Sequence, residues 1–200
     1  MKKRLILLIL VVISFNGCSV IKQIANLSKL KFKLGSVGNF RLAGIDINNK
    51  ASYSDFNVTE LMKLTSLFTE KKLPAVFTLN LEAQNPNGNT EYTQAPVITL
   101  KSLPWTLYLD DKETISGNIG QPVQVQGNNS VVTIPLDIQF DLLKVFQDGS
   151  LQNIAKLVLS VGGVKKDLTK VKLTAQPVID TPLGEMTYPE RLTIVNTEFK

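Results

Sequence analysis

The stretch AVFTLNLEAQNPNG, residues 75–88, indicates the fold, because it has the pattern of a half-buried strand that ends in a turn. Every second residue is apolar, and this period of two is typical of a strand with one buried face: Phe77, Leu79, Leu81 and Ala83. The residues Asn85, Pro86, Asn87 and Gly88 then end the strand, since proline lacks the N–H that a sheet needs and presets a turn. We predict that Asn87 or Gly88 takes a positive φ and that Asn85 hydrogen-bonds the backbone locally.

Residues 1–17 have the organisation of a bacterial lipoprotein signal peptide. Three basic residues at 2–4 precede an apolar run at 5–13, which is too short to span a hydrocarbon core of ~30 Å. Cys18 is the only cysteine in the chain, and residues 15–18 resemble the lipobox in which such a cysteine is lipidated. We therefore expect Cys18 to anchor the protein in a membrane, with a soluble secreted protein as the alternative.

Residues 18–30 read as a tether, and the charge balance excludes nucleic acid as a partner. Loss of the signal peptide lowers the count of Lys and Arg from 22 to 19 against 17 acidic residues, so only +2 remains. The basic residues that precede Asp46 either lie on anionic lipid headgroups or belong to a solvated linker. Ser19 after the cysteine is similar to the signal of outer-membrane lipoproteins, which predicts a protein that faces the periplasm.

Two segments have the apolar spacing of amphipathic helices. In residues 57–72, Asn57 and Glu60 form the pattern of a capping box, and Lys71 and Lys72 lie where a helix C-terminus favours cations. We expect Met62 and Phe68 of this helix in the core. The second helix spans residues 151–159 and ends at a pair of glycines.

The remainder is predicted to be β, with some seven short alternating strands. The clearest are a hairpin at 105–117, a long alternating strand at 131–140, a strand at 171–175 and a last strand at 192–199. Pro135 indicates either a sheet edge or a bulge in the strand at 131–140. A turn is predicted at Asp180, Thr181, Pro182, Leu183 and Gly184.

The chain has no histidine, which excludes a Ser-His-Asp triad and most zinc chemistry. The acidic residues at 110–113 lack the spacing and the glycine of a calcium loop. A Ser–Lys dyad or a carboxylate pair is the remaining catalytic alternative, although no feature of the sequence places such groups together. We predict no catalytic, cofactor-binding or metal-binding residues, and we expect that the protein is not an enzyme.

The quoted strand and its Asn-Pro-Asn turn, the hairpin at 105–117, the strand at 131–140 and the stretch at 178–184 together resemble the late embryogenesis abundant group 2 domain, also called the water stress and hypersensitive response domain. The resemblance covers residues 40–188. It implies an immunoglobulin- or fibronectin-type antiparallel β-sandwich and no catalytic residues. Residues 57–72 and 89–100 depart from the family pattern and look like insertions. We predict one β-sandwich domain over residues 31–200 that carries two helical insertions.

Two hypotheses for function follow. In the first, the β-sandwich is a binding or interaction module, with the stress-protective role that the resemblance implies. In the second, the protein is an envelope assembly or transport factor, and the apolar stripes of its two helices line a groove for an acyl chain instead of completing the core. The sequence names neither a protein partner nor a lipid.

Overall fold

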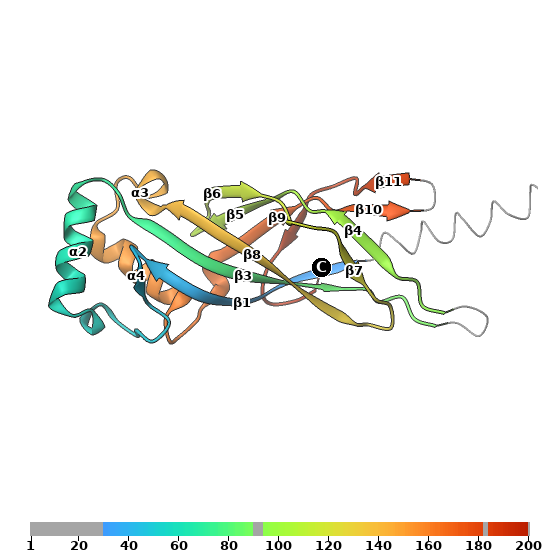
Figure 1. Cartoon of the computed structure of the whole chain (residues 1–200), viewed down its shortest axis with the longest axis horizontal. Coiled ribbons are helices and arrows are strands. Elements are labelled where there is room, and N and C mark those ends of the chain that lie inside the picture. The colour runs from blue at the N-terminus through green and yellow to red at the C-terminus, as the bar shows by residue number, and fades with distance from the viewer. Residues whose placement is uncertain (1–29, 90–93, 182–183, 200) are drawn as a thin grey trace, which may run out of the picture.

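The computed structural model describes residues 30–89, 94–181 and 184–199. The described chain is mainly β, with antiparallel strands in three sheets and helical insertions. This confirms the predicted fold class of a β-sandwich with helical insertions. The strands run along the long axis of the molecule and the helices gather at one end, with α2 outermost (Figure 1).

The first sheet has the strand order β2-β1-β3-β8, with these bounds: β1 Lys31–Leu42, β2 Ile45–Asp46, β3 Pro74–Gln84 and β8 Val131–Asp141. The second has the order β11-β10-β4-β7: β4 Ile98–Ser102, β7 Val123–Val125, β10 Val178–Thr181 and β11 Gly184–Thr187. The third has the order β12-β9-β5-β6: β5 Trp105–Leu109, β6 Lys112–Gly117, β9 Val171–Ala175 and β12 Leu192–Ile194. All three sheets contribute to one hydrophobic core.

Strand β3 lies in the interior of the first sheet, as its alternating sequence predicts. Its apolar face is fully buried, and it pairs with β8 without interruption from Pro74 to Gln84. The register of β1 against β3 shifts twice, between Leu34 and Val37 and again before Arg41. At these shifts, which are β-bulges or similar irregularities, the alternation of buried and exposed residues along β1 changes phase.

The helices are α2 Val58–Thr69, α3 Leu142–Val145 and α4 Leu151–Gly162, together with two short 3-10 turns, Tyr53–Asp55 and Leu168–Lys170. The apolar stripe of α4 completes the core. Ile154, Ala155 and Val158 are each at most 2% exposed, and the backbone of Gly162 lies against the ring of Phe40. For α4 the structure therefore favours core completion over an open acyl groove.

Helix α2 begins as predicted but is less buried than expected. Asn57 Oδ1 accepts a hydrogen bond from the Glu60 N–H at 2.9 Å, and the Glu60 carboxylate accepts one from the Asn57 N–H at 2.9 Å. The prediction that Met62 is a core residue is wrong, because its side chain is 69% exposed on the outer face of the helix. Helix α2 also ends at Thr69, and Lys71 lies beyond its last turn in a left-handed conformation.

Glu60 gives a pH-dependent prediction. A hydrogen bond from Lys50 Nζ at 2.8 Å, followed by the backbone N–H of Asn57, lowers the pKa of the Glu60 carboxyl below 4.5. A lowered folded-state pKa stabilises the protein above the unfolded pKa, and this contribution is lost as pH falls through the folded value. We expect Glu60→Gln to lower the free energy of unfolding at pH 7 by about 1 kcal/mol. In urea titrations between about pH 3 and 7, the free energy of unfolding should fall more steeply with falling pH for the wild type than for the variant. The same pH dependence in both proteins would contradict this.

Other strand predictions hold with one correction. The hairpin of β5 and β6 turns at Asp110 and Asp111, both with positive φ, and β8 is an edge strand, one of the two alternatives that Pro135 indicates. The last strand is shorter than predicted, because β12 ends at Ile194 and the chain beyond it is irregular.

Candidate functional site

The motif at 85–88 forms a hydrogen-bonded joint, centred on Asn85. This side chain is fully buried, and its Nδ2 donates to the carbonyl oxygens of Pro96 at 2.8 Å and Val125 at 3.2 Å. Its Oδ1 accepts from the backbone N–H of Asn87 at 3.1 Å and from the side-chain amide of Asn87 at 2.7 Å. The prediction that Asn85 hydrogen-bonds the backbone locally is confirmed, and the side chain also joins segments far apart in the sequence.

The prediction of a positive φ at Asn87 or Gly88 is wrong. Positive φ occurs instead at Asn128 and Asn129, in the loop before β8. The Asn128 N–H donates to the Asn87 carbonyl at 2.6 Å, and the Asn129 N–H donates to the Asn85 carbonyl at 3.0 Å. Strand β3 is followed along the chain by β4, which belongs to another sheet, and not by a hairpin partner. The residues with positive φ therefore lie in the loop between β7 and β8, which hydrogen-bonds to residues 85–87.

The second predicted turn is a hairpin between β10 and β11, in which Thr181 pairs with Gly184. Gly184 has a φ of +109°, which explains the glycine at this position. Pro182 and Leu183 lie outside the described residues, as do the predicted signal peptide and Cys18. Nothing brings this hairpin and the joint at Asn85 together into one site.

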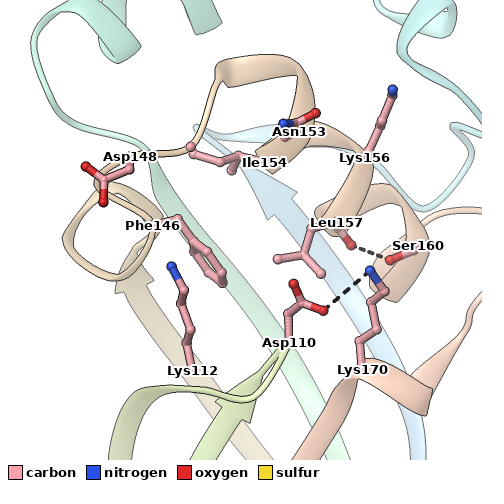
Figure 2. A pocket seen from close by; sticks show the side chains of 11 residues that line it. Asp110, Lys112, Phe146, Asp148, Asn153, Ile154, Lys156, Leu157, Ser160 and Lys170 are labelled. Carbon is pink, nitrogen blue, oxygen red and sulfur yellow. Dashed lines mark hydrogen bonds and ion pairs between the residues drawn. The ribbon is translucent and has the colours of Figure 1, made fainter.

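A hollow of about 470 Å³ lies where α3 and α4 approach the hairpin of β5 and β6 (Figure 2). Phe146, Ile154 and Leu157 form its apolar wall. Charged side chains surround this wall: Asp110, Lys112, Asp148, Lys156 and Lys170.

The charges around this hollow partly neutralise one another. Lys170 Nζ lies 3.5 Å from Asp110 Oδ1, and Lys112 Nζ lies 5.1 Å from the centre of the Phe146 ring. A cation over an aromatic face is attracted by the ring quadrupole, so Lys112 helps to hold the β5–β6 hairpin against α3. Opposite charges next to an apolar wall suit a polar contact with another molecule and offer no nucleophile paired with a base.

A second groove, of about 490 Å³, runs between the end of α2 and α3. Its lining combines the apolar side chains Phe68 and Leu143 with Lys71 and Lys144, and it contains no carboxylate. Phe68 and Leu143 are only partly buried. An apolar surface with two cations at its margin matches the chemistry of an anionic amphiphile.

The third hollow, of about 790 Å³, lies at the open edge of the sandwich between β8 and the segment that leads into β7. Core residues reach its lining, among them Trp105, Ile134 and Leu136. Among the described residues, the buried side-chain atom that lacks a hydrogen-bond partner is Nε1 of Trp105. Asp137 supplies the only charged side chain in the lining.

Sequence reasoning missed these three hollows, because each joins segments that are distant in the chain. Trp105 appeared only as one residue of a hairpin, and no local signal shows that its indole N–H is unpaired. The only available hint was Pro135, which marks β8 as an edge strand.

Within the described ranges, no three His, Cys, Asp or Glu side chains lie close enough to hold a metal ion. No helix in the described part of the chain has the length and apolar character needed to cross a membrane.

No protein-family model matches this chain, and no curated protein matches it either. Among solved structures, the chain is similar to a protein from Archaeoglobus fulgidus, with 9% sequence identity and a TM-score of 0.35. That alignment covers 80% of this chain and 94% of the other.

Proposed function

We propose that the protein is a non-catalytic, lipid-anchored protein of the cell envelope and that its β-sandwich is an interaction module. The observation that carries this proposal is the hollow at the β8 edge, which is open to solvent and which core side chains help to line. The indole N–H of Trp105, one of the lining residues, is buried without a hydrogen-bond partner. Hollows that combine apolar side chains with a few polar groups are common sites where other molecules bind. The resemblance to the late embryogenesis abundant group 2 domain adds a protective role under water stress to the proposal.

The membrane attachment in this proposal rests on the sequence of residues 1–18, with Cys18 as the lipidated residue at the periplasmic face of the outer membrane. Several acyl chains give lasting attachment, because each buried CH₂ contributes about 0.8 kcal/mol.

Cys18→Ala tests the anchor. Cells fed a radiolabelled fatty acid should incorporate label into the wild-type protein and none into the variant, which we expect to accumulate as a precursor of larger mass. Cys18→Ser is the matched control for the change in side-chain size and should behave like the alanine variant. A variant that is still labelled and processed would remove the lipoprotein proposal.

A second candidate function, the binding of a lipid or acyl chain for assembly or transport, is favoured by the groove between α2 and α3. Lys71 and Lys144 would pair with an anionic headgroup, and Phe68 and Leu143 would contact the first part of the chain. The groove is open, so it would hold a chain against the surface and not enclose it.

This candidate predicts that the double change Lys71→Glu and Lys144→Glu weakens oleate binding about tenfold, since two favourable charge contacts become repulsive. Isothermal titration calorimetry would measure this. Lys63→Glu is the control, because it reverses a charge on the same helix outside the groove lining. Native mass spectrometry of the purified wild-type protein is a second measurement, which should detect a bound lipid. A wild-type protein that carries no lipid, together with equal oleate affinities in all variants, would remove this candidate.

A further inference from the structure

Strand β8 presents a free backbone edge over the hollow that Trp105 lines. In the first sheet β8 is terminal and pairs with β3 alone. The direction of its backbone groups follows from the register, in which Pro135 lies opposite Asn80. The Asn80 carbonyl oxygen lies 3.0 Å from the position of a Cβ built on Gly35, so it points toward β1 and away from β8.

The pair of Asn80 and Pro135 is therefore a non-hydrogen-bonded pair of the antiparallel ladder. The backbone groups of Pro135 point away from β3, and so do those of the alternate residues Thr133 and Asp137. An edge of this kind can accept a further strand through main-chain hydrogen bonds. Pro135 removes one donor from the edge, which limits indiscriminate pairing with other chains.

We propose that this edge binds an extended peptide segment of a partner protein, which adds a strand next to β8 and places its alternate apolar side chains in the hollow. This inference rests on the proposed interaction function and names its site and the chemical class of its partner. The volume of about 790 Å³ falls within the range of ligand sites, about 300–1,000 Å³.

The lining specifies what such a segment contains. Side chains on one face of the added strand point into the sandwich, where Trp105, Ile119 and Leu136 provide apolar contacts. Side chains on the other face lie beside Thr133 and Asp137, which are exposed. Because Asp137 is the single charge and the lining contains no Lys or Arg, the outward positions favour Lys or Arg in the partner.

Trp105 adds a second, independent feature. The side chain is 5% exposed, and the N–H of its indole has neither a partner nor contact with water. A carbonyl of the partner can accept this hydrogen bond only if the indole or the residues that cover its N–H shift when the segment binds. Binding thus removes an unpaired buried donor, and the indole signal reports on occupancy.

The test selects linear 12-residue peptides from a phage-displayed random library on the full chain, purified from membranes in detergent. We expect enriched sequences with alternating apolar and basic residues. Titration of each peptide should shift the indole ¹H–¹⁵N signal, which is unambiguous because the chain has one tryptophan. Enrichment of no sequence, or peptides that leave this signal unmoved, would overturn the proposal.

Two matched comparisons distinguish strand addition from other contacts. Peptides with N-methyl groups on the backbone nitrogens of one edge should lose more than tenfold in affinity, and methylation of the opposite edge should leave affinity within about twofold. Trp105→Phe should weaken binding about fivefold, the equivalent of one neutral hydrogen bond, at temperatures and urea concentrations where the variant remains fully folded. Equal affinities in both methylated series would contradict strand addition. These outcomes are independent of Cys18 labelling, so failure here leaves the lipid anchor standing.

Discussion

Replacing Asn85 with alanine is expected to lower the free energy of unfolding by about 4 kcal/mol. The alanine leaves the carbonyl oxygens of Pro96 and Val125 and the N–H of Asn87 without their partner, in a place where the Asn85 side chain is fully buried. An unsatisfied buried polar group costs about 1–3 kcal/mol. Urea unfolding followed by far-UV circular dichroism would measure the loss.

Two variants control for the loss of side-chain volume. Asn85→Asp keeps an oxygen that accepts from Asn87. It replaces the amide that donates to the carbonyl oxygens of Pro96 and Val125 with a negatively charged oxygen, which these carbonyls repel. We therefore expect the free energy of unfolding to fall at least as much as for alanine. Asn87→Ala removes a half-buried side chain and should cost about 1 kcal/mol. An Asn85→Ala protein within 1 kcal/mol of the wild type would show that water replaces the side chain and that the joint does not hold the two sheets together.

The joint at Asn85 also shows how far the sequence alone leads. The alternating strand β3 and its end at Asn85 follow from period two and from Pro86, which are local signals. The partners of Asn85 at 96 and 125 belong to segments whose approach depends on the whole sandwich. A local rule for turns therefore assigned the positive φ to Asn87 or Gly88, whereas tertiary contacts place it at Asn128 and Asn129.

The helices illustrate the same limit. The capping box of α2 and the apolar stripe of α4 depend on neighbours in the sequence, so their prediction was accurate. Burial depends on what the rest of the fold covers. Helix α4 lies against β1 and buries its stripe, but α2 lies outermost at the end of the molecule and leaves Val58 and Met62 exposed (Figure 1).

The candidate site was the least predictable part, because Trp105, Ile119 and Leu136 meet only through the packing of two layers. A free strand edge was foreseeable at Pro135, since proline is tolerated where no ladder hydrogen bond is needed. The sequence does not predict that the Trp105 indole N–H is unpaired, because this depends on the position of every nearby acceptor.

Gly162→Ala is expected to lower the free energy of unfolding by about 2 kcal/mol, although alanine favours helices over glycine by about 1 kcal/mol. A Cβ built on Gly162 lies 2.6 Å from Cγ and 2.8 Å from Cβ of Phe40, too close for real atoms. Phe40 has little room to retreat, since it is 1% exposed and its ring stacks on Phe77 with centroids 4.7 Å apart. The added methyl group must therefore push α4 away from β1 or distort the ring stack.

A double-mutant cycle in urea measures whether this contact is the cause. Phe40→Leu should destabilise the wild type by about 1 kcal/mol through lost packing, yet it should cost less, or stabilise, in the Gly162→Ala background because it makes room for the methyl group. Gly38→Ala is the control, since a Cβ there meets no atom within 4 Å and should change stability by less than about 0.5 kcal/mol. Strictly additive effects of the two core changes would mean that the cost arises in the backbone of the helix end. In that case the close contact between Gly162 and Phe40 would not be what holds α4 against β1.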